Sequence, residues 1–348
     1  QVSGTVVYRP EKAKNESSRS GAIEISAKGV KVLNGSDWSE VPFVQKQLFN
    51  PHTATENETL RLKYRHLDLR RPEMQINLRA RSAITSAARR ELERCDFIDV
   101  ETPCLFKSTP EGAREFIVPC RSPGQFWALP QSPQQYKQLL MAGGIDKYYQ
   151  IARCFRDESG RADRQPEFTQ LDIEMAFVSA EDVMQVVEGV VVEMVSAACN
   201  VLGEDIGTFL PDSNSNERGQ GRFPRLSFAE AGTDKPDLPG YVWVTDFPLF
   251  EFDEDSEKLM STHHPFTAPH PDDVPMLWEA IKTKDHDLAL KVRALHYDLV
   301  SGGNEIGGGS IRIHDKALQQ AVMEDLLELS GEKLKSFSHL LNALGHGC

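Results

Sequence analysis

Two neighbouring segments of alternating or mixed polarity constrain the fold of this chain more than any other feature. Residues 167–178 alternate, so one face of a strand carries polar side chains and the other carries apolar ones. The polar face holds Gln170, Asp172 and Glu174. Residues 148–158 predict a second strand, joined to the first by the charged loop 159–165. A solvent-facing strand is the alternative, but polar groups that converge from adjacent strands favour a ligand site.

The rest of the chain mixes strands and helices without regular βαβ alternation. Apolar residues at helical spacing predict a helix over about 77–94, and cap signals at Ser132 and Ser179 predict two more. Short β segments are expected at 2–8, 22–27, 30–33, 126–129, 241–247 and 295–300. Two amphipathic helices, about 315–329 and 332–344, follow. These patterns predict an α+β fold on an antiparallel sheet, not a dinucleotide-binding fold.

Charge and hydropathy limit the partners of the chain. Its 39 basic and 52 acidic residues give a net charge of −13, which argues against nucleic-acid binding by the whole surface. Between Arg61 and Arg94, however, ten basic and four acidic residues give 10 − 4 = +6, a local basic face or a solvated helix face. The most apolar stretch, 186–199, is interrupted by Glu188 and Glu193, so we expect no membrane span.

Four groups of residues have chemistry that could bind a metal ion or a phosphate. The six cysteines form no Cys-x-x-Cys pair, which excludes a ribbon-type zinc site and favours a reducing compartment. His263 and His264 have no metal-ligand partner at helical spacing, so a zinc role is not predicted. The glycine-rich residues 306–313 match neither a P-loop nor a dinucleotide fingerprint. Asp298 and Glu305 bracket a turn and could hold Mg²⁺ beside a nucleotide, or stay unpaired on the surface.

Seven segments together resemble the class II aspartyl-tRNA synthetases of the bacterial and mitochondrial type. They occur in family order at 65–72, 108–114, 128–134, 153–158, 164–170, 263–269 and 305–314. The resemblance implies a six-stranded antiparallel catalytic sheet flanked by helices. It also implies a homodimer whose interface includes Pro103. The implied domains are a partial OB-fold, anticodon-binding module at 1–47, a linker at 48–71 and the catalytic domain at 72–348.

The resemblance also implies an activity and a set of site residues. The activity is that of an aspartate–tRNA ligase, which activates L-aspartate with ATP and Mg²⁺ and transfers it to tRNA(Asp). The ATP-binding residues are Arg156 (the catalytic residue, at the α-phosphate), Glu158, Gln165, Phe168, Asp298 and Glu305. The last two are the metal ligands. The aspartate-binding residues are Glu111, Ser132, Gln134, Lys137, Gln170, Asp172, His263, His264 and Arg312.

The chain departs from the family pattern in three places. Only the closing part of the OB-fold is recognised, an insertion domain is missing near 238–240, and the third class II motif does not follow residue 344. From these departures we expect weak ATP binding and low activity, and we do not predict recognition of the anticodon.

The sequence leaves two alternative functions open. One alternative is an ammonia-dependent asparagine synthetase, against which the β module and the basic segment 61–94 argue. The other is a non-catalytic relative that binds tRNA or a protein partner. The mitochondrial matrix is the expected location, with the bacterial cytoplasm as the alternative.

Overall fold

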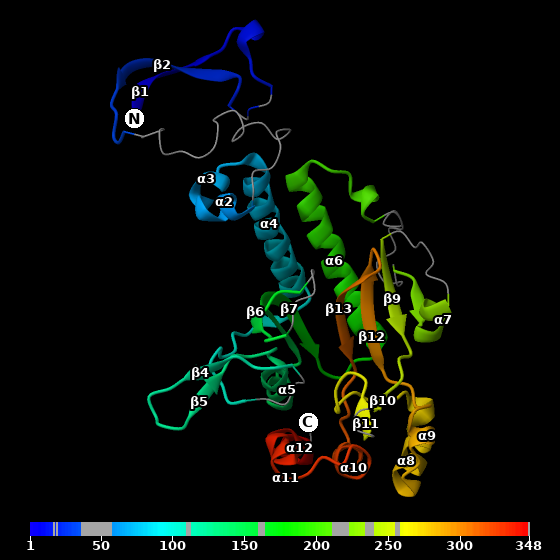
Figure 1. Cartoon of the computed structure of the whole chain (residues 1–348). Helices are drawn as coiled ribbons and strands as arrows, with labels where there is room; N and C mark the ends of the chain where they lie inside the picture. The colour runs from blue at the N-terminus through cyan, green and yellow to red at the C-terminus, as the bar shows by residue number, and fades with distance from the viewer. Residues whose placement is uncertain are drawn as a thin grey trace. The chain divides into compact units, whose positions relative to one another are not determined.

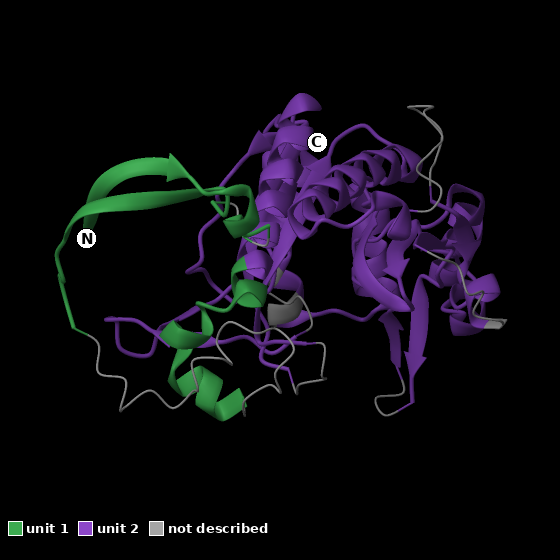
Figure 2. Cartoon of the chain, turned by 90° about the horizontal axis from the view of Figure 1, so that it is seen from above, with its two compact units in different colours: residues 1–75 green, residues 76–348 purple. Residues whose placement is uncertain are grey.

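The structure is a computed structural model, and it describes residues 1–16, 18, 20–35, 58–108, 113–158, 164–210, 223–233, 240–254 and 258–346. The chain divides into two compact units, residues 1–75 and 76–348 (Figure 2). The predicted domain boundaries, including the one between linker and catalytic domain at 71/72, stay predictions.

The first unit contains one β-hairpin and two short helices. Strands β1 (Val2–Tyr8) and β2 (Ile23–Val30) pair antiparallel with a shift in register after Ser3, and both are exposed along their length. The predicted separate strand at 30–33 is wrong, because β2 continues unbroken from residue 23 to residue 30. The 3₁₀ turn η1 (Glu11–Ala13) lies between the strands, and helices α2 (Glu58–Lys63) and α3 (Arg65–Asp68) occupy the predicted linker, whose residues 48–57 lie outside the described part.

Part of the basic segment has a structural role in this unit. Asp68 is buried, and its carboxylate pairs with the guanidinium groups of Arg61, Arg65 and Arg71. Burial of Asp68 opposes its ionisation, but the three arginines outweigh that effect and lower its pKa. These three basic residues thus balance a buried charge, which accounts for part of the local excess of +6.

A three-stranded sheet forms one layer of the second unit. Strand β6 (Lys147–Phe155) lies between β3 (Ile98–Asp99), which is parallel to it, and β7 (Glu167–Met175), which is antiparallel. The apolar face of β7 packs with the long helix α4 (Pro72–Arg94) around Leu92 and Tyr149. The predicted alternation of β7 is therefore confirmed. Strands β4 (Ile117–Pro119) and β5 (Phe126–Ala128) form a separate hairpin, and α5 (Gln134–Ala142) precedes β6.

A four-stranded sheet has the order β13-β12-β9-β8. Strands β9 (Tyr241–Thr245), β12 (His296–Ser301) and β13 (Asn304–Ser310) are antiparallel, and β8 (Arg225–Ser227) is parallel to β9. Residues 203–240 were predicted to be a loop, but their described part includes η2 (Ile206–Thr208), β8 and α7 (Phe228–Thr233). In the described residues the strands thus form one sheet of four strands, one of three and three of two, and the expected single six-stranded antiparallel sheet is not observed.

Helix α6 (Ala180–Leu202) connects the cores of both sheets (Figure 1). It starts with the predicted capping box between Ser179 and Asp182. Met184 packs against the four-stranded sheet, and Val190 packs in the cluster of the three-stranded sheet. Its length and hydropathy would also suit a membrane span. In this structure, however, its Glu188 is buried and accepts hydrogen bonds from Trp243 (3.0 Å) and Arg225 (2.6 Å), as in a core helix.

The remaining elements pack below the four-stranded sheet in Figure 1. The hairpin β10 (Phe250–Asp253)–β11 (Lys258–Ser261) shares a core with helix α8 (Val274–Thr283). A 3₁₀ turn, η3 (Pro271–Asp273), precedes α8, and α9 (His286–Ala289) follows it. The predicted helix at 315–329 is α10 (Lys316–Ala321) followed by the π-helical η4 (Val322–Leu326). The predicted helix at 332–344 is interrupted at Phe337 into α11 (Gly331–Ser336) and α12 (Ser338–Gly345).

Candidate active site

A buried lysine is at the centre of the site. Lys137 lies on α5 and is 6% exposed, and its ammonium group is 2.7 Å from Asp172 and 3.1 Å from Glu174 on the polar face of β7. Burial disfavours the charged ammonium, but the two carboxylates outweigh this and raise the pKa of Lys137. The polar face predicted for β7 therefore forms an ionic network and is not a solvent-facing surface.

Arg312, just beyond β13, extends this network from the other sheet. Its Nη2 donates to Gln134 Oε1 (3.0 Å), its Nη1 donates to Ser310 Oγ (2.7 Å), and its Nε is 3.8 Å from a carboxylate oxygen of Glu174. The same guanidinium contacts the ring of His264. Arg312 thus connects β7, α5 and the end of β13, elements that are far apart in the sequence.

Several polar atoms of this network are buried without a hydrogen-bond partner in the described part of the chain. They are Nε2 of Gln134, Oδ2 of Asp172 and Nε of Arg312. Buried polar groups in proteins are normally satisfied, and leaving one unsatisfied costs about 1–3 kcal/mol. A donor amide, an acceptor carboxylate and a donor guanidinium together suit a ligand that carries both an ammonium and a carboxylate group.

The hairpin formed by β6 and β7 carries a second cation. The guanidinium of Arg156 lies over the ring of Phe168, 5.2 Å from its centroid, and its Nε is buried with no hydrogen-bond partner in the described residues. Glu158 pairs with Arg164 at 3.4 Å at the mouth of the hairpin, and Gln165 is exposed beside them. Arg156 is held over an aromatic face with donor capacity to spare, a geometry that suits an anionic ligand.

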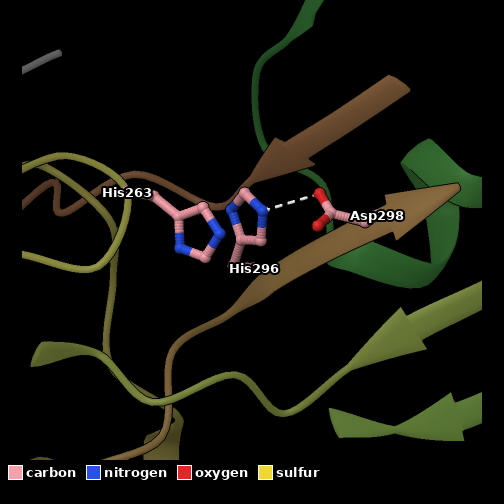
Figure 3. A group of neighbouring side chains, drawn as sticks. All are labelled: His263, His296 and Asp298. Atoms are coloured by element: carbon pink, nitrogen blue, oxygen red, sulfur yellow. Dashed lines mark hydrogen bonds and ion pairs between the residues drawn. The ribbon is translucent and has the colours of Figure 1, made fainter. Parts of the chain in front are cut away.

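Two stacked imidazole rings lie beside the end of β12 (Figure 3). The ring centroids of His263 and His296 are 3.3 Å apart, and His296 Nε2 donates to Asp298 Oδ1 at 2.8 Å. Burial, and then the neighbouring His296, lower the pKa of His263 to about 4. Burial and the charge of Arg312 lower the pKa of His264 well below its usual value. Both rings of the His263-His264 pair are therefore neutral near pH 7.

Asp298 and Glu305 lie on the paired strands β12 and β13, as predicted. Partial desolvation and the nearby carboxylate of Asp298 raise the pKa of Glu305, while His296, Arg164 and Arg156 act in the opposite direction. Because these charges influence one another, the carboxylate pair lies within electrostatic range of the Arg156 hairpin. Two carboxylates on neighbouring strands are a suitable oxygen donor set for Mg²⁺.

The glycine-rich strand β13 lets neighbouring side chains approach its backbone closely. A Cβ at Gly308 would lie 2.2 Å from Asp298 Oδ1, and a Cβ at Gly309 would lie 2.8 Å from the ring of Tyr297. At Gly307 a Cβ would meet nothing within 4 Å. Two of the three glycines are thus explained by close contacts with the adjacent strand, a common reason for glycine within a strand.

The remaining predicted residues have mixed placements. Ser132 Oγ accepts from the backbone N–H of Gln134 (3.3 Å), and Gln170 accepts from Cys154 (3.2 Å). Pro103 is exposed, and Glu111 lies outside the described residues. Next to that region, Gln131 is buried and holds the backbone of Ala113 through two hydrogen bonds of 2.9 Å.

Two residues of the site, Ser310 and His296, are not predicted from the sequence, and Glu174 is predicted only as part of the polar face of β7, without a role. Glu174 had a usable signal, since it shares the polar face of β7 with Asp172. Ser310 becomes relevant only because Arg312 folds back onto it. His296 lies 296 − 263 = 33 residues after His263, on a different element, so no local spacing connects the two.

Comparisons with known proteins agree with this geometry. Residues 57–348 match the family described as tRNA synthetases class II (D, K and N). The mitochondrial aspartate–tRNA ligase of Bos taurus is 38% identical over all of this chain and 70% of its own length. That of Dictyostelium discoideum is 34% identical over all of this chain and 68% of its own length. The aspartate–tRNA(Asp/Asn) ligase of Salinibacter ruber is 35% identical over 99% of this chain and 74% of its own length.

Solved structures show the same fold. An asparaginyl-tRNA synthetase of Pyrococcus horikoshii, complexed with asparaginyl-adenylate, superposes with a TM-score of 0.71 at 22% identity, over 99% of this chain and 74% of that one. A putative aspartyl-tRNA synthetase of Leishmania major gives 0.71 at 18% identity, over 100% and 73%. The alignment with the bovine protein runs over 478 residues, which is 478 − 348 = 130 more than this chain contains.

Proposed function

This chain belongs to the class II tRNA synthetases (D, K and N), and on that premise we propose that it is an aspartate–tRNA ligase. The reaction forms aspartyl-adenylate from L-aspartate and ATP and then transfers the aspartyl group to the 3′ end of tRNA(Asp). The observation that carries the proposal is the pair of cations formed by the buried Lys137 and the half-buried Arg312, bridged by Glu174.

The choice of amino acid follows from the charge of that pair. A side-chain carboxylate could accept from Arg312 and from Lys137 at once, whereas an amide presents one acceptor and places its NH₂ against a cation. The two cations are balanced by Asp172 and Glu174, so the empty network is stable and Asp172 keeps Lys137 in place. We assign the recognition of the substrate's side chain to Lys137 and Arg312.

The other proposed contacts surround the substrate. The groups for the amino-acid backbone are Glu111, Ser132 and Gln134, and those that line the pocket are Gln170, His263 and His264. The neutral state of His264 matters here, because a neutral ring can accept a hydrogen bond from Arg312 without repelling it.

The first chemical step needs no general base, since the α-carboxylate of aspartate is already a nucleophile. It needs alignment for in-line attack and positive charge where charge develops on the α-phosphate. We assign that charge to Arg156, whose Nε is buried and has no hydrogen-bond partner among the described residues. Phe168, Glu158 and Gln165 would contact the nucleotide from the same hairpin.

The carboxylates of Asp298 and Glu305 fit a magnesium ion by their chemistry and mutual influence. They would hold it, and when bound it neutralises charge on the nucleotide phosphates. The chain's own contribution is to keep the two carboxylates on adjacent strands, with Gly308 leaving room for Asp298.

Further features of the proposal concern assembly and location. We expect a homodimer with Pro103 in its interface, a mitochondrial location by analogy with the bovine relative, and no association with a membrane. The 130 alignment positions beyond the length of this chain are compatible with an insertion in that relative, and we propose that the insertion domain is missing near 238–240. The bovine and Salinibacter relatives are aspartate–tRNA ligases, which does not favour the asparagine synthetase alternative.

The test is formation of the adenylate under single-turnover conditions. The protein is mixed with α-labelled ATP, Mg²⁺ and L-aspartate, and aspartyl-adenylate is separated from AMP. We expect a product that requires aspartate, is not formed with asparagine and is lost in Arg156→Ala. Formation of asparagine when ammonia is added would establish the alternative enzyme. Salt-sensitive binding of tRNA with no adenylate would favour a non-catalytic tRNA-binding protein.

A further inference from the structure

Three side chains beside the nucleotide carboxylates form a cluster of a different chemical kind. One ring nitrogen each of His263 and His296 and one carboxylate oxygen of Asp298 all lie within 4.8 Å of one another. His263 comes from the segment after β11, and the other two alternate along β12 (Figure 3). His263 is exposed and Asp298 is half-buried, so the cluster is reachable from solvent.

His296 can face both other members of the cluster. It is 8% exposed, and its Nε2 donates to Asp298. That bond leaves Nδ1 as the unprotonated nitrogen of the neutral ring, and Nδ1 is buried with no hydrogen-bond partner in the part of the chain that the structure describes. Figure 3 shows this nitrogen on the side of His263. The lone pair of His296 Nδ1 is therefore buried beside a second imidazole, where a hydrogen-bond donor or a cation could satisfy it.

We propose that His263, His296 and Asp298 bind a divalent transition-metal ion of the zinc and cobalt type. Two imidazole nitrogens and one carboxylate are a donor set that such ions prefer and that Mg²⁺ does not. Water would complete the coordination, since the chain supplies three ligands.

Binding requires all three side chains to move, and Asp298 must leave its hydrogen bond to Nε2, because an ion bound at Nδ1 lies on a different edge of the His296 ring. Zinc takes nitrogen and oxygen ligands at about 2.0–2.2 Å, so the ligand atoms must come closer together than 4.8 Å. The stacked rings must also tilt, because a metal lies in the plane of each imidazole that binds it. Phe247 packs edge-on against both rings, so His263, whose outer edge is exposed, must slide on this contact as it tilts, while the buried His296 moves less.

This site shares Asp298 with the carboxylate pair assigned to Mg²⁺. A transition-metal ion bound here would remove one of the two proposed magnesium ligands and act as an inhibitor of adenylate formation. This consequence rests on the proposed function, whereas the binding site rests on the geometry of the three side chains alone.

The direct test is titration of the metal-free protein with Co²⁺, followed by its visible absorption, and then displacement by Zn²⁺. We expect one bound ion per chain and absorption bands typical of Co²⁺ bound to nitrogen and oxygen ligands. Both His296→Ala and His263→Ala should weaken binding by at least about tenfold. The exposed His263 makes its variant safe for folding if the buried His296→Ala proves unstable. His270→Ala is the matched control, because His270 also lies near an aspartate, Asp272 (3.6 Å), but belongs to no such cluster.

The outcomes separate the inference from the proposed function. No Co²⁺ bands, or a His263→Ala variant that binds as tightly as the wild type, would overturn the site. If the site binds Co²⁺, Zn²⁺ should inhibit adenylate formation in the wild type and inhibit His296→Ala, relative to that variant's own zinc-free activity, at least about tenfold less strongly. Equal inhibition of both would overturn the competition. Absence of adenylate before any zinc is added would instead contradict the proposed function.

Discussion

Replacing Lys137 with methionine is the most informative perturbation of this structure. The ammonium group lies 2.7 Å and 3.1 Å from two nearly buried carboxylates. Methionine keeps the volume but removes the charge, so Asp172 and Glu174 are left close together with only Arg312 nearby. Breaking a buried pair by removing one partner costs about 3–5 kcal/mol. We therefore expect Lys137→Met to lower the free energy of unfolding by about that amount near pH 7.

The pH dependence of that loss identifies its cause. In the wild type the raised pKa of Lys137 means that its contribution is present at neutral pH and is lost as pH rises through that pKa. Burial also raises the pKa of Asp172, so the pairing weakens when Asp172 is protonated in acid. In the variant, the uncompensated carboxylates should have raised pKa values. The folded state then binds an extra proton as pH falls, so the stability difference should be smaller in an acidic buffer than at pH 7.

Urea unfolding followed by circular dichroism at both pH values measures these quantities. Lys291→Met is the matched control, because Lys291 is exposed and its replacement should change stability by no more than about 0.5 kcal/mol. A double variant, Lys137→Met with Asp172→Asn, should recover part of the loss because one unpaired charge is removed. A loss at Lys137 no larger than that of the control would refute the claim of a buried, charge-balanced network.

Two further predictions concern other parts of the second unit. Asp273 accepts three hydrogen bonds of 2.9–3.0 Å from Arg293, and these bonds lower the pKa of Asp273. Asp273→Asn should therefore lower the free energy of unfolding by about 1.5–3 kcal/mol near pH 7, measured by thermal or urea unfolding, and this loss should vanish as pH falls through the lowered pKa. A loss that is independent of pH would contradict the ion pair. Gly308→Ala would put a Cβ 2.2 Å from Asp298 Oδ1, so this variant should bind Co²⁺ at least about tenfold more weakly. Gly307→Ala is the control, because its Cβ meets nothing within 4 Å and Co²⁺ binding should be unchanged. Equal effects of the two variants would show that the glycines do not act through Asp298.

Local pattern predicted much of the fold because it reports directly on burial. The alternation along β7 placed Asp172 opposite the core, and the cap at Ser179 marked the start of α6. The local pattern failed where contacts between residues far apart in the sequence determine the secondary structure. The helix expected over 332–344 breaks at Phe337, whose side chain is buried with Phe266 and Met323. Strand β8 pairs in parallel with β9, although only 241 − 227 − 1 = 13 residues separate the two strands in the sequence.

The site was predictable where residues lie on one element, or where a resemblance supplied the partner. Lys137 and Asp172 came from the resemblance, and the structure brings them into contact. Glu174 was on the predicted polar face but was not assigned a role. His296 could not be found from spacing, because its contact with His263 depends on the path of the chain between β11 and β12.

The most direct test of the central claim is the preference for a substrate carboxylate over an amide at Lys137 and Arg312. Calorimetry would compare two stable adenylate analogues, the sulfamoyl adenosines of L-aspartate and L-asparagine, in the wild type and in Arg312→Gln. We predict that the wild type binds the aspartyl analogue at least about 100-fold more tightly, which is about 2.7 kcal/mol, and that Arg312→Gln loses most of this preference. Equal affinity for the two analogues in the wild type, or an undiminished preference in Arg312→Gln, would contradict the assignment.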